Sequence, residues 1–323
     1  MNILSFLYGI LVLGMLVSPI SQAAESSPQQ VYADASPAVV MVLGYGEAGS
    51  KGNGGTGLII RSDGLVLTNA HVVVDETTGR PFPKVYAYLK PDRVTGNRKS
   101  DLARGFKASV LAYSDALDLA LVRLENPPAP LPVLELSDSD RVRIGDRVMA
   151  IGHPEQGGLW TLTTGVVSAE FENFNDVRGK HVFQTEVGLN RGNSGGPLID
   201  ASGRVIGINT AIARLAADGL PITSISFSLK SNVARTWLKE QGTRVEMAAA
   251  PLESPASVAG AAGAAGGAGG KAAASGASKG APTAQAPPPA RPYSLDDLIR
   301  ERSLAEADME NMIKEMRQKS RRR

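Results

Sequence analysis

Residues 31–242 consist of short apolar, β-branched runs separated by turn residues, and this pattern restricts the fold more than any other feature of the chain. The runs at 58–60 and 65–68 flank Ser62-Asp63-Gly64, which is typical of a hairpin turn. Further runs lie at 39–43, 84–89, 108–112, 119–124, 147–152, 161–169, 181–186, 198–200 and 204–211. Because long helices do not alternate with these runs, the pattern predicts an all-β antiparallel barrel or sandwich and not a βαβ fold.

A helix is expected to close this β-rich region at residues 231–241. Val233, Ala234, Trp237 and Leu238 share one face of it, and Gly242 follows its last turn. We place the folded domain at residues 31–247.

The composition changes abruptly after this domain. Residues 248–292 are almost entirely Ala, Gly, Ser and Pro, which cannot bury enough apolar surface to fold, so we expect a disordered linker.

A charged amphipathic helix is predicted at residues 293–323. Ser294 resembles an N-cap and is followed by Asp296 and Asp297 in the first turn. Apolar residues then recur at a spacing of three to four, interrupted by Arg302, at Leu295, Leu298, Ala305, Met309, Met312 and Met316. Either this helix is solvated, or it docks on a partner helix, on the barrel or on an anionic surface.

The first 23 residues indicate export from the cytosol. Residues 3–17 form an apolar run, and Ser21-Gln22-Ala23 offers a small–x–small cleavage site. We interpret residues 1–23 as a signal peptide, with an uncleaved inner-membrane anchor as the alternative. The expected location is the periplasm or the exterior, or the periplasmic side of the inner membrane.

Composition excludes several classes of function. With 34 basic and 32 acidic residues, the net charge of +2 gives no support for a nucleic-acid partner. The chain has no cysteine and three histidines, so we expect no disulfide, no thiolate metal site and no histidine-rich metal site. An exported chain without disulfides suits a bacterial envelope protein.

Hydrolysis by a serine needs a base, an acid that orients the base, and donors for the oxyanion. Among the histidines, His71 alone has apolar sequence on both sides that could hold its ring. His153 lies at a strand-to-turn boundary before a proline, and His181 lies in a charged turn. Asp118 stands out among the acidic residues because we expect it inside an apolar strand, where a carboxylate needs a partner. Asp115 is interpreted as a turn residue.

The segment Arg191-Gly192-Asn193-Ser194-Gly195-Gly196-Pro197-Leu198 supplies a candidate nucleophile, Ser194. By itself it could be only a glycine turn that leads into a strand. If Ser194 is the nucleophile, the amides of Gly192 and Ser194 can point into one concavity as oxyanion donors. The order His71, Asp118, Ser194 is the order of chymotrypsin-type enzymes.

Three motifs together resemble those of the HtrA/Deg group of trypsin-like serine proteases. They are Thr68-Asn69-Ala70-His71-Val72-Val73, Asp118-Leu119-Ala120-Leu121 and Gly192-Asn193-Ser194-Gly195-Gly196-Pro197-Leu198. The resemblance covers residues 31–242. It implies two six-stranded β-barrels with the site between them, no cofactor, and an envelope serine endopeptidase acting in protein quality control or regulated proteolysis on unfolded or regulatory polypeptides. It implies His71 as general base, Asp118 as its orienting acid and Ser194 as nucleophile.

The resemblance also implies a specificity pocket with two walls. One is Gly188-Leu189-Asn190 and the other is Asn209-Thr210-Ala211. Neither wall contains an acidic residue, so we expect cleavage after small or aliphatic residues and not after Lys or Arg. Asn193 stands where digestive members carry an aspartate that pairs with a freed N-terminus, so activity is expected to depend on loop ordering and not on maturation.

Two departures from the group are evident. Arg191 replaces the proline that is usual there, and we expect residues 248–323 in place of a PDZ domain. Homo-oligomer formation and a partner for the C-terminal helix stay open. The alternative functions are a catalytically silent chaperone-like binder and an adaptor that acts through the C-terminal helix.

Overall fold

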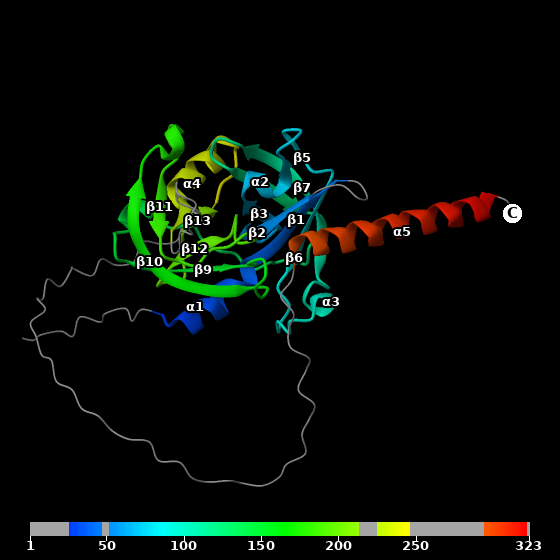
Figure 1. Cartoon of the computed structure of the whole chain (residues 1–323), viewed down its shortest axis with the longest axis horizontal. Helices are drawn as coiled ribbons and strands as arrows, with labels where there is room; N and C mark the ends of the chain where they lie inside the picture. Colours follow the sequence, from blue (N-terminus) through cyan, green and yellow to red (C-terminus); the bar gives the residue numbers. More distant parts are fainter. Residues whose placement is uncertain (1–25, 47–51, 213–224, 246–293, 322–323) are drawn as a thin grey trace, which may run out of the picture.

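The computed structural model describes residues 26–46, 52–212, 225–245 and 294–321. Within these ranges the strands form two closed barrels, each of six antiparallel strands (Figure 1). The first barrel has the order β1-β2-β3-β8-β7-β6 and the second the order β10-β11-β14-β13-β12-β9. The expected chymotrypsin-like fold of two six-stranded barrels is confirmed.

The first barrel uses the predicted strand runs, but the strand expected at 58–60 begins at Gly52, so the glycine-rich segment before that run is also part of the strand. Its strands are β1 (Val39–Tyr45), β2 (Gly52–Arg61), β3 (Leu65–Thr68), β6 (Lys84–Leu89), β7 (Gly105–Ser114) and β8 (Leu119–Leu124), and a short ribbon joins β4 (Val74–Asp75) to β5 (Arg80–Pro81). The predicted hairpin turn lies between β2 and β3, where Gly64 has a φ of 93°. Glycine adopts that conformation without the clash that a Cβ would cause.

The second barrel contains one strand that the sequence patterns did not indicate. Its strands are β9 (Arg147–Gly152), β10 (Thr161–Phe171), β11 (Val182–Thr185), β12 (Pro197–Asp200), β13 (Val205–Ile212) and β14 (Ser226–Lys230). The missed strand, β14, pairs with both β11 and β13 and so closes the barrel. Its sequence, Ser-Phe-Ser-Leu-Lys, alternates polar and apolar residues but contains no β-branched residue, and β-branched residues are the stronger strand signal.

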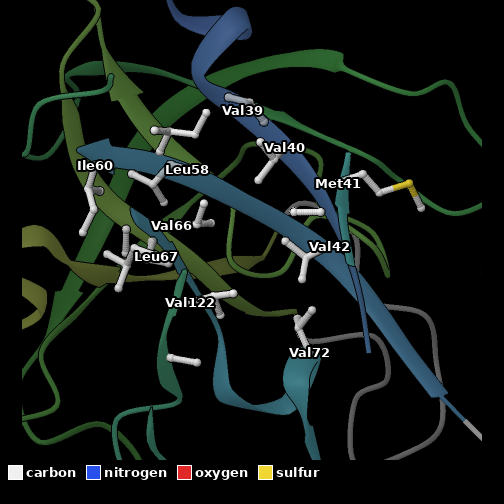
Figure 2. Close-up of a cluster of buried hydrophobic side chains, with 14 of the residues drawn as sticks. Val39, Val40, Met41, Val42, Leu58, Ile60, Val66, Leu67, Val72 and Val122 are labelled. Carbon is white, nitrogen blue, oxygen red and sulfur yellow. The ribbon is translucent and has the colours of Figure 1, made fainter. Parts of the chain in front are cut away.

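The core of the first barrel is made of aliphatic side chains from neighbouring strands. Figure 2 shows Val40, Val42, Leu58 and Val66 among the side chains of this cluster, and each is at most 1% exposed. Every residue of β1 is buried. The carbonyl oxygen of Val39 accepts a hydrogen bond of 2.8 Å from the indole Nε1 of Trp160, so β1 also contacts the residue that directly precedes the second barrel's strand β10.

Short helices complete the domain. They are α1 (Pro28–Ala35), α2 (Ala70–Val73), α3 (Arg98–Asp101) and α4 (Ser231–Glu240), with 3₁₀ turns η1 (Ser36–Ala38), η2 (Ser139–Arg141) and η3 (Phe174–Asp176). The predicted closing helix is therefore confirmed as α4. Helix α1 was not expected, although Ser27 caps it and Pro28 stands at its first position, where proline is favoured.

The C-terminal helix α5 (Leu295–Arg321) lies against β1 and β2 of the first barrel and then extends away from it (Figure 1). Of the expected alternatives for this helix, the structure shows docking on the barrel. The predicted N-cap is present, since the hydroxyl of Ser294 accepts a hydrogen bond of 3.4 Å from the amide of Asp297.

Two predicted segments lie outside the described residues: the signal peptide or anchor at 1–23 and the linker at 248–292. Within the described ranges, every helix is too short or too polar to cross a lipid bilayer.

Candidate active site

The three candidate catalytic residues come from three separate elements. His71 lies in α2, directly after β3, and Asp118 directly precedes β8, so both belong to the first barrel. Ser194 lies in the loop between β11 and β12 of the second barrel. A Cβ built on Gly55 would meet a methyl of Val72 at 2.6 Å and the carbonyl oxygen of Ser194 at 2.7 Å. The serine loop therefore packs beside the helical turn that carries His71.

Asp118 does not lie inside a strand, and that expectation is wrong. Its φ is 56°, which is left-handed, and its amide donates a 3.2 Å hydrogen bond to the carbonyl oxygen of Asp115, so the two aspartates form a turn. The short polar side chain of aspartate tolerates this backbone better than an apolar residue would. Asp115 is confirmed as a turn residue.

The turn points the Asp118 carboxylate at His71. Its two oxygens lie 3.0 and 2.9 Å from Nδ1 of His71, and Oδ1 also accepts a 3.1 Å hydrogen bond from the His71 amide. The hydroxyl of Thr210 donates a third hydrogen bond to Oδ2, at 2.7 Å. Three donors therefore hold the carboxylate, and the Nδ1–H tautomer leaves Nε2 of His71 able to accept a proton.

Burial and charge act in opposite directions on this pair. Burial disfavours the imidazolium, but the hydrogen bond and negative charge of Asp118 outweigh it, so the pKa of His71 is raised above its usual value. Burial likewise disfavours the Asp118 carboxylate, but His71 and then Thr210 outweigh it and lower the pKa of Asp118. Both shifts favour an ion pair when His71 takes up a proton.

Side-chain hydrogen bonds also hold the backbone of His71 and Asp118. The side-chain amide of Asn69 donates a 2.6 Å hydrogen bond to the carbonyl oxygen of Asp118, and that of Asn53 donates a 2.7 Å hydrogen bond to the carbonyl oxygen of His71. An open hollow of about 470 Å³ adjoins the ring of His71 and includes Val74, Asp118 and Lys180 in its wall.

The loop that carries Ser194 has two residues in the left-handed region. Gly192 has a φ of 99° and Gly195 a φ of 83°. Among the described residues, the amides of Gly192 and Ser194 donate none of the backbone hydrogen bonds of this loop, whereas the amides of Asn193 and Gly195 donate to Asn190 and Asn209 at 2.9 and 2.8 Å. The two candidate oxyanion donors are thus left available, which suits their predicted role.

In the part of the chain that the structure describes, no hydrogen bond joins the Ser194 hydroxyl to His71. Catalytic hydrogen bonds are often long without substrate and shorten when it binds.

Thr56 contacts the serine loop from the first barrel, and the sequence motifs did not single it out. Its hydroxyl donates a 2.7 Å hydrogen bond to the carbonyl oxygen of Gly192, and its amide donates a 2.8 Å hydrogen bond to the carbonyl oxygen of Ser194. The residue is fully buried in β2. Its position in Gly55-Thr56-Gly57, a polar residue between glycines at the start of an apolar strand, was the available signal.

His153 has a structural environment. It is buried, its ring meets the ring of Trp160 edge-on with 4.7 Å between centroids, and Nδ1 lies 3.0 Å from the Thr56 hydroxyl. Because that hydroxyl already donates its hydrogen to Gly192, Nδ1 of His153 is the donor to Thr56. Burial lowers the pKa of His153 to about 3, so it is neutral.

The two predicted pocket walls differ in exposure and in hydrogen bonding. Gly188 and Asn190 are exposed, and Leu189 is 9% exposed. Asn209 is buried, with its side chain bonded to Pro197 and Ser228, while Thr210 bonds to Asp118. Ala211 lies in β13, opposite Phe227.

Arg191, which had no assigned role, lies between two carboxylates. Its guanidinium is 3.5 Å from Glu155 and 3.4 Å from Asp296 of α5. Sequence reasoning did not link these three residues, because each comes from a different segment.

Comparison with known proteins agrees with the fold of this domain. Residues 55–208 match the trypsin-like peptidase domain. The magnetosome formation protease MamE of Paramagnetospirillum magneticum is 36% identical over 191 residues, which are 58% of this chain and 24% of MamE. The periplasmic pH-dependent serine endoprotease DegQ of Escherichia coli is 38% identical over 184 residues, which are 56% of this chain and 36% of DegQ. The chain covers well under half the length of these curated relatives.

A solved structure of an HtrA-type protease is also similar to this chain. The HtrA-type protease AlgW with a tripeptide superimposes with a TM-score of 0.53 and 29% sequence identity, covering 67% of this chain and 65% of the AlgW chain.

Proposed function

Because residues 55–208 form a trypsin-like peptidase domain homologous to the HtrA-type serine proteases, we propose that the chain is an exported serine endopeptidase. Ser194 is the nucleophile, His71 the general base and Asp118 the residue that orients His71. The observation that supports this most directly is the Asp118 carboxylate, held by three donors with both oxygens within 3.0 Å of Nδ1 of His71.

The proposed reaction proceeds through an acyl-enzyme. Nε2 of His71 takes the proton of the Ser194 hydroxyl as Oγ attacks the carbonyl carbon of the scissile bond. The amides of Gly192 and Ser194 donate hydrogen bonds to the oxyanion. His71 then returns the proton to the leaving amine, and the peptide bond breaks. A water molecule, deprotonated by His71, hydrolyses the ester in the second half of the reaction.

Small or aliphatic residues are the proposed preference before the scissile bond. The walls at Gly188-Leu189-Asn190 and Asn209-Thr210-Ala211 carry no charged side chain, and Leu189 is apolar. A Lys or Arg side chain would therefore lose its hydration without gaining a carboxylate, which is costly.

The proposed location is the bacterial envelope, and the proposed substrates are unfolded or regulatory polypeptides. DegQ and DegP of Escherichia coli are named periplasmic serine endoproteases, and residues 1–23 are expected to direct export. These proteases support envelope proteolysis as the setting for the reaction, and homo-oligomer formation is part of the same proposal.

The test compares wild type with Ser194→Ala on casein and on a peptide series with Val, Ala, Lys or Arg before the scissile bond. We expect hydrolysis by wild type alone, fastest after Val or Ala. Equal hydrolysis by Ser194→Ala would contradict the serine mechanism. Faster cleavage after Arg than after Val would contradict only the specificity.

An adaptor function through α5 is the second candidate. Leu304, Met309, Met312 and Ile313 of this helix are exposed, although one face is docked on the barrel. An adaptor would keep its cellular effect in Ser194→Ala and lose it in Met312→Asp, whereas a protease shows the opposite dependence.

A further inference from the structure

Helix α5 is held on the first barrel by an apolar contact beside the serine loop. Leu295, Leu298 and Ile299 are 1%, 6% and 4% exposed. A Cβ on Gly54 would collide with Leu295, and one on Gly52 would meet Ile299 at 3.0 Å. These two glycines of β2 therefore leave the space that the helix fills. Burial of these three side chains removes their apolar surface from water, and this favours docking of the helix.

A buried polar cluster extends the same contact along α5. Glu306, 8% exposed, accepts a 2.8 Å hydrogen bond from the Tyr45 hydroxyl and lies 3.1 Å from Nζ of Lys84. Arg302 lies 3.1 Å from Glu306 and 4.3 Å from the centre of the Tyr86 ring. This cluster fixes the position of α5 along the barrel, because a shift of the helix would separate Glu306 and Arg302 from their partners on the barrel.

The first turn of α5 reaches the residue before Gly192. The amide of Leu295 donates a 3.4 Å hydrogen bond to Oε1 of Glu155, and Asp296 pairs with Arg191. Glu155 also pairs with Arg191 through Oε2, and its amide donates a 2.6 Å hydrogen bond to the Arg191 carbonyl oxygen. Glu155 thus joins the serine loop to the start of α5, where a carboxylate is favoured by the helix dipole.

The serine loop is restrained both from within and from outside. Within it, the amides of Asn193 and Gly195 donate hydrogen bonds to Asn190 and Asn209, but the buried side-chain oxygen of Asn193 accepts none among the described residues. Gly192 has a φ of 99°, and glycine adopts positive and negative φ about equally readily, so the residue itself does not favour this conformation. Thr56 restrains the loop on one side, and Glu155 and Arg191 restrain it on the other.

We propose that docked α5 positions the serine loop for catalysis, with Glu155 and Arg191 as positioning residues that connect the helix to Gly192. This inference rests on the proposed peptidase function. The exposed ion pairs of Arg191 are worth little as binding energy. Their role is to direct the loop, while the apolar face of α5 supplies the affinity. Release of the helix removes Asp296 and the Leu295 amide from this network and leaves the oxyanion donors less ordered.

The main test releases the helix in the full-length chain. Ile299→Asp places a charge in the contact, and Leu304→Asp is the matched control because Leu304 is 56% exposed on the same helix. We expect Ile299→Asp to lower kcat about tenfold to a hundredfold, the range for a displaced catalytic group, with KM changed far less. Affinity for a peptidyl boronate, which mimics the tetrahedral intermediate, should fall with kcat/KM. Leu304→Asp should match wild type in all three.

Hydrogen exchange gives a readout that does not need activity. Peptides spanning residues 188–196 should exchange faster in Ile299→Asp than in Leu304→Asp. If wild type lacks Ser194-dependent hydrolysis but this difference persists, the proposed function fails and the coupling stands. If wild type is active and Ile299→Asp changes neither kcat nor exchange, the coupling is wrong.

Substitutions at Arg191 and Asp296 test the link between α5 and the serine loop. Both side chains are exposed, so these substitutions should not impair folding. Asp296→Arg should lower kcat, and Arg191→Asp combined with Asp296→Arg should restore part of it. Glu155→Gln should lower kcat more than Asp296→Asn, since Glu155 contacts both the loop and α5. A rise in kcat on release of α5 would identify the helix as an inhibitor and overturn the proposal.

Discussion

The hydroxyl of Thr56 donates a hydrogen bond of 2.7 Å to the carbonyl oxygen of Gly192, and this contact joins the first barrel to the serine loop of the second. The same hydroxyl accepts hydrogen bonds from the backbone and Nδ1 of His153. A residue of the other barrel thus holds the carbonyl group of Gly192, the residue whose amide is a candidate oxyanion donor.

Thr56→Val keeps the shape of this residue but removes its hydroxyl. We expect unfolding free energy to fall by about 1–3 kcal/mol, because the buried Gly192 carbonyl loses its donor. We also expect kcat to fall by roughly tenfold or more through the displaced amide. Chemical denaturation and peptide kinetics measure both, and Thr56→Ser should retain most of each. Unchanged kcat in a stable Thr56→Val variant would contradict the positioning role.

Asp118→Asn replaces the acceptor of the His71 Nδ1–H with a side chain that can also donate. We expect kcat to fall on the order of 10⁴-fold, as in other triads of this type. The pKa of His71 is raised chiefly by Asp118 against the effect of burial, so the acid limb of the kcat/KM profile should move to lower pH in the variant. The residual activity measured between pH 4 and 9 tests this. An acid limb at the wild-type pH would mean that another group titrates.

Thr210→Val removes one of the three donors to the Asp118 carboxylate. A hydrogen bond to a charged group contributes about 1.5–3 kcal/mol, so we expect kcat/KM to fall by roughly tenfold to a hundredfold. Because Thr210 helps to lower the pKa of Asp118, that pKa should be higher in the variant than in wild type. Thr210→Ser, which restores the hydroxyl, is the control.

A comparison of Gly195→Ala with Gly203→Ala separates the cost of a positive φ from the cost of a steric clash of the new Cβ. The two glycines have φ values of 83° and 81°. A Cβ on Gly203 meets nothing within 4 Å, whereas one on Gly195 collides with Thr56, Thr68 and Asn69. We expect Gly203→Ala to cost about 1–2 kcal/mol in thermal unfolding and to leave activity intact. Gly195→Ala should cost more and abolish activity. Equal costs would show that the loop can move aside.

Acid should weaken the docking of α5 through Glu306. Burial disfavours its carboxylate, but hydrogen bonds from Tyr45, Lys84 and Tyr86 and the charge of Arg302 outweigh burial and lower the pKa of Glu306. Its contribution is therefore complete above the usual glutamate pKa of about 4.3 and is lost as pH falls through the lowered value.

The chain has no cysteine, so Leu304→Cys gives a single site for a fluorophore on the helix. We expect its anisotropy to fall on acidification below about pH 4. Glu306→Gln in the same labelled chain should start lower and change less. A transition of the same size in both would place the pH sensitivity elsewhere.

The sequence by itself determined the barrel strands other than β14, the main turns and the serine loop. Apolar runs and Asp-Gly or glycine-rich turns act through local sterics and burial. Residues 58–68 therefore indicate a hairpin, and Gly192 indicates a turn in the serine loop, without knowledge of the rest of the chain. The order of His71, Asp118 and Ser194 was also readable, because each lies in a local motif.

Only the tertiary structure decided how these segments meet. Asp118 is bonded in a left-handed turn and not within a strand, Thr56 reaches Gly192 across 136 positions of sequence, and Arg191 reaches Asp296 across 105. Local sequence patterns do not predict such pairings, because the side chain of a threonine between glycines, or of an arginine beside a glycine, can equally well hydrogen-bond to water. When the two barrels close and α5 docks, water is excluded from these polar groups. Because a buried polar group without a hydrogen bond is costly, the groups then bond to one another.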